Sequence, residues 1–410
     1  MNLKKIFFDD PARIFFVSSS FILVLIILPF YTLKDEYKFS SYLFIFICYF
    51  SAFLGLKIGN LEFKKNFIKK ETISLKIFNK ILLITTLISV IGIILTTYEY
   101  FVVRGLRFTL DISQNKIAWF KSNTSVLSML ASLFETFSIF LLPIFLQKYH
   151  RFKDRKFLFS STLIFFIHLS FGILLGSRVV ILLSVIIIFL SYLFYFQIKL
   201  KYLLTFLVFF IFLFGYIFDL RVKGYGYSIF DSLYYSGYSF LLSPNNDYFD
   251  NEFSKSFFLT SLYSLYMYLI HGFYEMSYIL EKSFIYYDYG KNLLWLPLKV
   301  INTIFGMEIE PSLDSLRGGV YQTFIATFFR DFKYYSPLFI FIIFFLIAYP
   351  FKKLKNGNES WFFVVVILSL WLLSSPFFSP FGSGPFTYCL TISLIIKLIF
   401  LYYSRKENKN

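Results

Sequence analysis

The sequence predicts an all-α integral membrane protein that crosses the membrane about ten times and carries one large, partly helical loop. Hydrophobic residues make up 58% of the 410 residues and charged residues only 16%, whereas a soluble domain has about 45–50% and about 25%. Apolar runs of about 20 residues, the length of a membrane-spanning helix, recur along the whole chain. Two or three soluble domains, which the length alone would allow, are therefore excluded.

The apolar runs divide the chain into three parts. Residues 1–218 are predicted to form a membrane domain with seven spans, residues 219–335 a large loop, and residues 336–410 a second membrane domain with three spans. Cys48 and Cys389 lie inside apolar runs, which favours packing as small hydrophobic side chains over a disulfide or a metal site. The expected spans are 13–33, 39–57, 79–98, 125–146, 157–175, 179–196, 202–218, 336–350, 361–374 and 386–403.

The positions of Lys and Arg predict the orientation, because basic residues near span ends are retained on the cytoplasmic side. More than half of the 40 basic residues lie at one side of the predicted bundle, in the N-terminus, four connecting loops and the C-terminal tail. The loop 219–335 carries more acidic than basic residues. We therefore expect both termini in the cytoplasm and this loop on the opposite side. The net charge of +16 then reflects topology and attraction to membrane lipids, and no nucleic-acid partner is expected.

The large loop is too long to be an unstructured connection, so it is expected to fold and to carry function. Residues 257–280 predict a helix with many polar side chains, and residues 292–305 predict a shorter apolar helix interrupted by Pro297. A third helix, beyond the polar stretch 308–319, is expected to run into the eighth span.

Arginine is distributed differently from lysine. Lysine outnumbers arginine three to one, yet six of the ten arginines fall on the outer side. The planar guanidinium group binds phosphate through two parallel hydrogen bonds, so this bias indicates a phosphorylated ligand. The alternative for any one of them is a pair with a loop carboxylate or a lipid headgroup. The six are Arg104, Arg107, Arg178, Arg221, Arg317 and Arg330.

Two of these arginines have the clearest positions. Arg178 follows Gly176 and Ser177 in a tight turn between two spans, where an unpartnered charge would be costly. Arg221 lies just past the seventh span and is expected to be a second phosphate ligand, with an interfacial anchor as the alternative.

His271 and Glu275 lie one helical turn apart, so their side chains are expected on one face of the predicted helix. A histidine beside a carboxylate is a candidate general base, with a structural histidine as the alternative. Tyr268 and Tyr278 extend this face and are candidates for stacking on sugar rings, although tyrosine is also typical of membrane interfaces. Within the spans, Glu135 and His168 are ionisable residues near mid-membrane, which we expect to hydrogen-bond neighbouring helices.

Several motifs of nucleotide and metal chemistry are missing from the sequence. It contains no Gly-rich phosphate loop, no Cys or His cluster and no Asp-x-Asp pair of the kind that holds a metal ion. A cytoplasmic enzyme acting on nucleotide sugars is therefore disfavoured, and no metal or other cofactor is expected.

The chain resembles the O-antigen polymerases, also called oligosaccharide repeat unit polymerases, in its layout and in three short motifs. The motifs are the Gly176-Ser177-Arg178 turn, the segment Leu269-Ile-His271-Gly272-Phe-Tyr-Glu275, and the segment from Gln322 to Arg330-Asp331-Phe332 that enters the next span. The last segment is similar to the family's aspartate-phenylalanine-glycine ending, with Lys333 in place of the usual glycine.

The resemblance implies a GT-C-like glycosyltransferase in the bacterial inner membrane that needs no metal ion. It would transfer a growing chain from undecaprenyl diphosphate to a new lipid-linked repeat unit on the periplasmic face, for O-antigen, capsule or a related surface polysaccharide. Arg178, Arg221, Arg317 and Arg330 would bind the diphosphate, and His271, Glu275 or Asp331 would assist the acceptor hydroxyl. A chain-length regulator protein is a possible partner.

Three alternatives remain open. An O-antigen ligase joins the same lipid-linked chain to a lipid A core and would need the same arginines and a similar loop. A lipid-linked oligosaccharide flippase or transporter would be expected to have shorter loops and more evenly spaced spans. A non-catalytic membrane scaffold would leave the outward bias of arginine unexplained.

Overall fold

A computed structural model describes residues 7–61, 73–109, 114–115, 118–119, 125–196, 200–223, 226, 228, 230–231, 240–245, 256–281, 287–307, 309 and 322–407. These residues are mostly helical. The main helices are α2 (Pro11–Ile27), α3 (Phe39–Gly59), α4 (Leu75–Tyr98), α6 (Val126–Phe152), α7 (Leu158–Leu174), α8 (Arg178–Tyr195), α9 (Leu200–Lys223), α12 (Phe257–Glu281), α13 (Trp295–Phe305), α14 (Phe324–Phe332), α15 (Ser336–Lys355), α16 (Phe362–Ser374) and α17 (Gly384–Glu407).

Three tighter or wider helical turns and two strands complete the described elements. The π-helical turn η1 (Glu99–Val103) extends α4, η4 (Lys333–Tyr335) joins α14 to α15, and η5 (Glu359–Trp361) precedes α16. Strand β1 (Tyr31–Leu33) pairs antiparallel with β2 (Leu242–Pro244), so that Thr32 lies opposite Ser243.

Within the described residues, five helical segments are long and apolar enough to cross a membrane. They are Phe39–Gly59, Leu75–Val103, Val126–Phe152, Phe324–Lys355 and Gly384–Glu407. The shorter apolar helices are Pro11–Ile27, Leu158–Leu174, Val179–Tyr195, Leu204–Leu220 and Glu359–Ser374. Each range predicted from the sequence overlaps one of these segments, so the all-α membrane character is confirmed. The number of ten spans stays a prediction, because the shorter apolar segments, of 10–17 residues, have fewer than the about 20 residues that a spanning helix typically needs.

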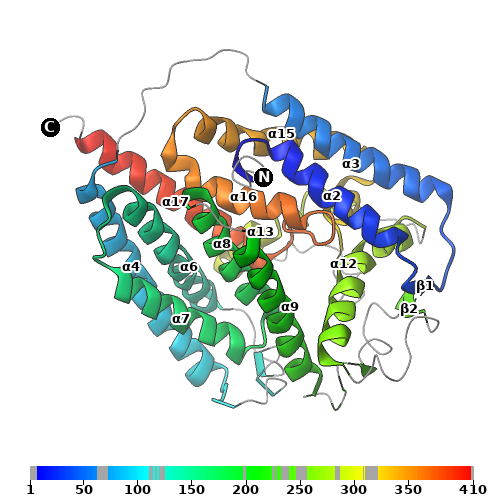
Figure 1. The fold of residues 1–410 in the computed structure, drawn as a ribbon, viewed down its shortest axis with the longest axis horizontal. Coiled ribbons are helices and arrows are strands. Elements are labelled where there is room, and N and C mark those ends of the chain that lie inside the picture. Colours follow the sequence, from blue (N-terminus) through cyan, green and yellow to red (C-terminus); the bar gives the residue numbers. More distant parts are fainter. Residues whose placement is uncertain are drawn as a thin grey trace.

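The helices form two groups on either side of α16 (Figure 1). Helices α4, α6 and α7 make up one group, and α2, α3 and α15 the other. The most extensive contacts lie within these groups, between α4 and α6 and between α3 and α15. Helix α16 contacts α2, α8, α15 and α17. All of its residues except Leu373 are buried, which explains why its sequence is apolar on every side.

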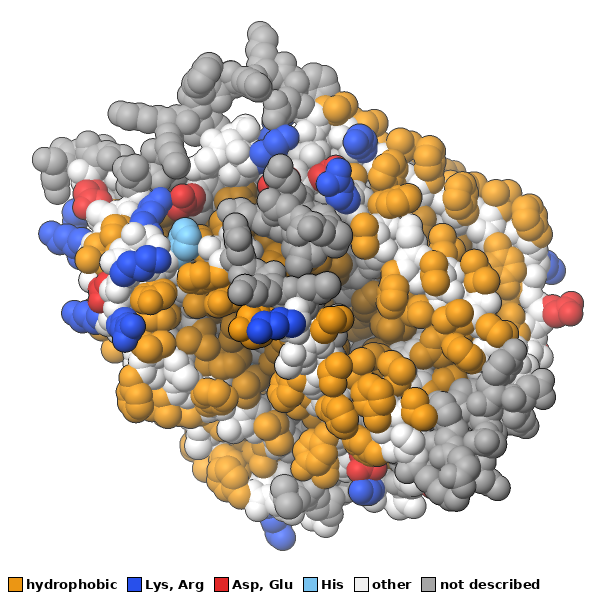
Figure 2. Space-filling view, viewed as in Figure 1, with side chains coloured by type: hydrophobic (Ala, Val, Ile, Leu, Met, Phe, Trp, Pro, Cys, Tyr) orange, Lys and Arg blue, Asp and Glu red, His pale blue; other side chains and the backbone are white. Residues whose placement is uncertain are grey.

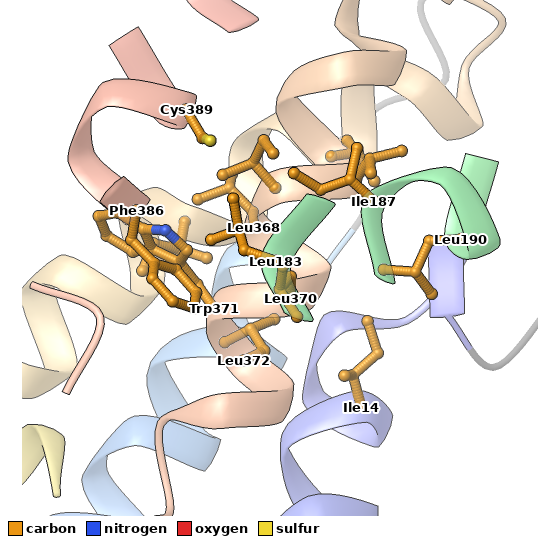
Figure 3. Packing of buried hydrophobic residues seen from close by; sticks show 14 of the residues in the cluster. Ile14, Leu183, Ile187, Leu190, Leu368, Leu370, Trp371, Leu372, Phe386 and Cys389 are labelled. Atoms are coloured by element: carbon orange, nitrogen blue, oxygen red, sulfur yellow. The ribbon is translucent and has the colours of Figure 1, made fainter. Parts of the chain in front are cut away.

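Figure 3 shows how α16 is surrounded. Side chains of α16 pack between those of α2, α8 and α17, and all belong to one large buried cluster. Cys389 lies in this cluster, and Cys48 is likewise a buried free thiol. The prediction that both cysteines pack as small hydrophobic residues is confirmed. The labelled side chains are Ile14, Leu183, Ile187, Leu190, Leu368, Leu370, Trp371, Leu372, Phe386 and Cys389.

Helices α3 and α15 approach each other closely because two glycines of α3 face α15. A Cβ atom added at Gly55 would lie 2.5 Å from the Phe341 carbonyl oxygen, and one added at Gly59 would lie 2.5 Å from the Phe345 carbonyl oxygen. Two glycines four residues apart let helix backbones touch within a membrane. The spacing of Gly55 and Gly59 in the sequence therefore makes this close approach of the two helices possible.

The predicted helix at 257–280 is confirmed as α12, which packs against α2, α3 and α9. The Tyr263 hydroxyl donates to the Phe30 carbonyl at 2.7 Å, and the Tyr266 hydroxyl lies 3.1 Å from the Leu28 carbonyl. Buried residues of α12 belong to the same cluster as those of the spanning helices. Helix α12 of the predicted large loop is thus part of the bundle core.

The outer surface is strongly apolar. Figure 2 shows hydrophobic side chains over much of the visible face, with Lys and Arg gathered at the upper left, where α17 ends and α4 begins. Phe16, Phe46 and Phe50 are each more than half exposed. A continuous exposed apolar face of this kind is typical of contact with lipid. The basic end is the one that the sequence predicts to be cytoplasmic.

Candidate functional site: a cavity at one end of the bundle

The predicted His271 and Glu275 pair lies on α12, and both side chains are buried. The Nδ1 atom of His271 is 2.8 Å from the carbonyl oxygen of Tyr268. One turn of helix separates the two residues, so the expected common face is confirmed. Their catalytic role stays a prediction.

The two tyrosines predicted to stack on sugars are engaged with aromatic neighbours. The Tyr268 ring packs against Phe214 with ring centroids 5.6 Å apart, and the Tyr278 ring packs edge-on against Phe240 at 5.8 Å. Both tyrosines are half-buried. Each of the two rings is therefore already in contact with another aromatic ring of the protein.

Asp331 is fully buried at the end of α14 and accepts three hydrogen bonds. The backbone N–H and the side-chain amide of Asn292 donate to Oδ1 at 3.0 and 2.8 Å, and the Leu293 N–H donates to Oδ2 at 2.9 Å. These bonds hold the turn before α13. The sequence predicts that this helix begins at residue 292, but it begins at Trp295. The Asp331 carboxylate therefore has a structural function in joining two segments of the large loop.

The Nη2 atom of the neighbouring Arg330 lies 3.6 Å from Oδ2 of Asp288. Two residues after Asp331, Lys333 has a backbone φ of +49°. Such a positive φ favours glycine. The backbone at Lys333 thus has the conformation that suits the glycine of the family motif.

The remaining predicted phosphate ligands are described only in part. Arg178 is the first residue of α8, after the turn in which Gly176 has a φ of +58°. Arg221 lies in the last turn of α9, and not beyond it as predicted. The side chains of these two arginines, and all of Arg317, lie outside the described residues.

A cavity of about 540 Å³ lies at one end of the bundle. Its walls come from η1, α6, α7, α8, α13 and α17, so no single stretch of sequence forms it. This end is opposite the basic surface described above, because α4 and α7 end here and α6, α8 and α17 begin here. The lining includes Tyr100, Arg104, Trp119, Ser128, Ser132, Glu135, His168, Ser177, Trp295, Lys299, Gly384 and Tyr388.

Helix N-termini converge on this cavity. Ser128 is in the first turn of α6, Ser177 precedes α8, Trp295 begins α13 and Gly384 begins α17. Ser125 caps α6, whereas α8 and α13 begin without a side-chain cap. The N–H groups of an uncapped first turn carry partial positive charge and favour anions. Lys299 of α13 adds a full positive charge to the same wall.

A buried ion pair closes the cavity beside η1. The Arg104 Nε atom donates to Glu99 Oε1 at 2.7 Å, and its two terminal nitrogens donate to the Trp119 carbonyl and to Ser128 Oγ. The guanidinium group also lies 3.7 Å from the Trp119 ring centroid. These hydrogen bonds let Arg104 hold the cavity wall in place. The Glu99 carboxylate partly neutralises the charge of the guanidinium group.

A second buried polar group joins four helices at the cavity. His168 of α7 lies between Glu135 of α6, at 2.7 Å from Nδ1, and Ser184 of α8, at 3.1 Å from Nε2. Thr96 of α4 donates to the other Glu135 oxygen at 3.4 Å. The prediction that Glu135 and His168 hydrogen-bond neighbouring helices is confirmed. Ionisable groups buried among apolar helices are costly, and in membrane-spanning segments they are commonly functional.

An apolar groove of about 500 Å³ lies between α2 and α3. Phe15, Phe16, Tyr49 and Phe50 contribute to its walls, and Phe273 of α12 closes one side. Its lining is almost entirely hydrocarbon and aromatic, so it suits a lipid chain and not a polar ligand.

The sequence identified some of the cavity residues and missed others. Glu135 and His168 stood out as ionisable residues in apolar runs, and Arg104 as one of the outer arginines. Lys299, Trp119 and Trp295 carried no signal, because a single Lys or Trp in a loop is common. Among the described residues, no group of three or more His, Cys, Asp or Glu side chains could hold a metal ion.

The three motifs of the family resemblance lie in different parts of the fold. The Gly176 to Arg178 turn borders the cavity, whereas the segments Leu269–Glu275 and Gln322–Phe332 lie on α12 and around α14. No family model matches the chain, and no curated protein or solved structure matches it, so its family membership stays a prediction.

Proposed function

We propose that this protein is a metal-independent membrane glycosyltransferase that polymerises undecaprenyl-diphosphate-linked oligosaccharide repeat units. The observation that carries the proposal is the cavity at the end opposite the basic surface, where helix N-termini, Lys299 and aromatic side chains converge. In this proposal the ten apolar helices all span the bacterial inner membrane in a GT-C-like arrangement. Both termini are cytoplasmic and the cavity opens toward the periplasm.

The anionic part of the substrate would bind at the helix N-termini. A diphosphate needs several hydrogen-bond donors and positive charge, which the uncapped starts of α8 and α13 and the Lys299 ammonium supply. Arg178, the first residue of α8, is the predicted phosphate ligand nearest in sequence to this N-terminus. Donors aimed at the leaving diphosphate stabilise the charge that develops on it during transfer.

The sugar and lipid parts would bind to different surfaces. Tyr100, Trp119, Trp295 and Tyr388 line the cavity, and aromatic faces are suited to pack against sugar rings. The polyprenyl chain would lie against the exposed apolar surface of the helices, which suits contact with lipid. In this proposal His271 and Glu275 of α12 remain the predicted residues of the acceptor site, and Asp331 holds the turn before α13.

The experiment that tests this function fills the cavity. Ser132→Trp places an indole in the space beside Glu135, whereas Leu130→Trp places the same group on a side chain that is 42% exposed. With purified protein in detergent and lipid-linked repeat units, we expect Ser132→Trp to lose about a hundredfold in polymer formation, because misplaced reactants react slowly. Leu130→Trp should retain wild-type polymer length. A full polymer ladder from well-folded Ser132→Trp would contradict the proposal.

A second prediction concerns the predicted diphosphate ligands. Arg178→Lys and Arg221→Lys keep the positive charge but lose the planar fork, so each should raise KM for lipid-linked donor and shorten the polymer. Arg405→Lys, at an exposed position near the end of α17, is the matched control. Unchanged polymer ladders from both outer variants at normal protein levels would remove these two residues from the diphosphate site.

The same assays separate the alternatives. A ligase would transfer the chain only when a lipid A core acceptor is present, so a polymer ladder from repeat units alone excludes it. A flippase is favoured by one observation, the intramembrane Glu135–His168 pair, because such pairs are typical of proton relays. Movement of labelled lipid-linked repeats across proteoliposomes, without polymer formation, would support the flippase.

A further inference from the structure

The hydrogen bonds around His168 determine how many protons the Glu135–His168 pair holds. The Ser184 hydroxyl donates its only hydrogen to the Val180 carbonyl at 2.7 Å. Ser184 Oγ can then only accept from His168, so Nε2 carries a hydrogen. On the other side, Nδ1 and Glu135 Oε1 lie 2.7 Å apart, and this bond also needs one hydrogen. The pair therefore holds one shared proton and is neutral as a whole.

The surroundings allow this proton to reach a ligand. Glu135 and His168 both line the cavity, although their residues are only 9% and 3% exposed. The charged and titratable groups on the facing elements are Glu99, Tyr100 and Arg104 of η1 and its C-terminal cap, Lys299 of α13, and Tyr388 and Cys389 of α17. Glu99 and Arg104 form an ion pair with each other. Lys299 of α13 contributes a positive charge to the facing wall, and Thr96 of α4 and Ser184 of α8 contribute hydroxyl groups.

We infer that the Glu135–His168 pair is the proton-exchange site of this cavity, giving its shared proton to a bound diphosphate and recovering one from the attacking hydroxyl. This rests on the proposed function. The acceptor oxygen forms a bond to the anomeric carbon as the bond from that carbon to the diphosphate oxygen breaks. The electron pair of the broken bond stays on the phosphate oxygen, which takes the proton of the pair. The proton of the acceptor hydroxyl then restores the pair.

The charge of the pair predicts how it affects binding. With its proton the pair is neutral, and without it the pair carries one negative charge. A negative charge beside a diphosphate repels it, and the repulsion is strong where water is excluded. Anion binding should therefore weaken as pH rises and the pair loses its proton. Where binding takes up one proton, the affinity falls by about tenfold for each unit by which the pH rises.

The test measures binding of farnesyl diphosphate to the purified protein by calorimetry between pH 6 and pH 8.5, in two buffers that differ in ionisation enthalpy. We expect wild-type protein to take up protons on binding at the higher pH and to lose affinity as pH rises. Glu135→Gln keeps a hydrogen-bonding partner for Nδ1 but cannot ionise, so its affinity should follow only the titration of the probe itself. His150→Gln, at an exposed position near the opposite end of α6, should behave as wild type.

A second variant, Ser184→Ala, keeps the test informative if Glu135→Gln fails to fold. Ser184→Ala removes the partner of Nε2 but leaves the pair itself, so proton uptake should persist with its pH dependence displaced. The inference is overturned if the affinity of the wild-type protein has the same pH dependence as that of Glu135→Gln. It is also overturned if the wild-type protein and Ser184→Ala share one pH dependence and neither takes up protons on binding. Absence of farnesyl diphosphate binding also overturns it.

The polymer assay distinguishes failure of this inference from failure of the proposed function. If Glu135→Gln polymerises lipid-linked repeats at the wild-type rate and pH profile, the exchange site is wrong while the polymerase stands. If Glu135-dependent proton uptake is found but no lipid-linked repeat is ever polymerised, the site stands as a proton-linked anion site and the polymerase is wrong. His271→Gln, measured beside these variants, shows which histidine the pH profile depends on.

Discussion

Gly92→Ala is expected to force α4 away from α6 and to disrupt the Glu135–His168 pair. Alanine in a helix is normally about 1 kcal/mol more favourable than glycine. Here a Cβ atom would lie 2.3 Å from the Glu135 backbone nitrogen and 2.4 Å from the Phe134 carbonyl carbon. Helix backbone cannot move aside as a side chain can. We therefore expect a net loss of about 1–3 kcal/mol in stability, as for other overpacked cores, together with most of the activity.

The measurement is thermal unfolding in detergent alongside the polymer assay. Val90→Leu is the matched control, because it adds a methylene group two residues away on a side chain that is 41% exposed. The control should unfold at the wild-type temperature. An equally stable and active Gly92→Ala protein would mean that α4 and α6 are not in backbone contact at Glu135.

The second large effect is expected at the α3–α15 contact, which the Gly55 and Gly59 pair makes possible. A Cβ atom at Gly55 would lie 2.5 Å from the Phe341 carbonyl oxygen and 3.0 Å from the Phe345 nitrogen. Each single Gly→Ala change should cost about 1–3 kcal/mol. The double variant should cost less than the sum, since the first methyl group already separates the helices.

The same unfolding assay tests this contact, with Ile47→Val as the control on the 42% exposed, outward face of α3. Because α16 packs against both α2 and α15, separation of α3 from α15 should also reduce activity by loosening the centre of the bundle. If Gly55→Ala and Gly59→Ala unfold at the wild-type temperature, the close approach of these helices is wrong.

Much of the helical structure could be predicted because it depends on local sequence. Apolar runs define the spanning segments, and the switch from apolar to polar residues marks their ends. The helix at 257–280 was found in the same way and extends by one residue, to Glu281. The start of α13 was predicted three residues too early, because Asn292 and Leu293 are held by Asp331 from a distant part of the chain. No local pattern reports such a bond.

The candidate site could be predicted only in part. Sequence spacing places His271 beside Glu275, since both lie on one helix. Spacing cannot pair Glu135 with His168 and Ser184, which come from three different helices. It also cannot place Lys299 of the large loop at the same cavity.

The sequence by itself determined that this protein is an all-α membrane protein, which residues form its apolar helices, and at which end its basic residues gather. These properties follow from the cost of placing charges and unpaired backbone groups in lipid. Each apolar segment avoids that cost by itself, because a helix pairs its backbone groups internally and excludes charged side chains. Only the tertiary structure decided that α16 lies at the centre and that helix N-termini, Lys299 and the Glu135–His168 pair share one cavity. The reason is physical: the faces that helices present to one another depend on close packing at residues such as Gly55 and Gly92, and apolar periodicity does not distinguish a helix neighbour from lipid.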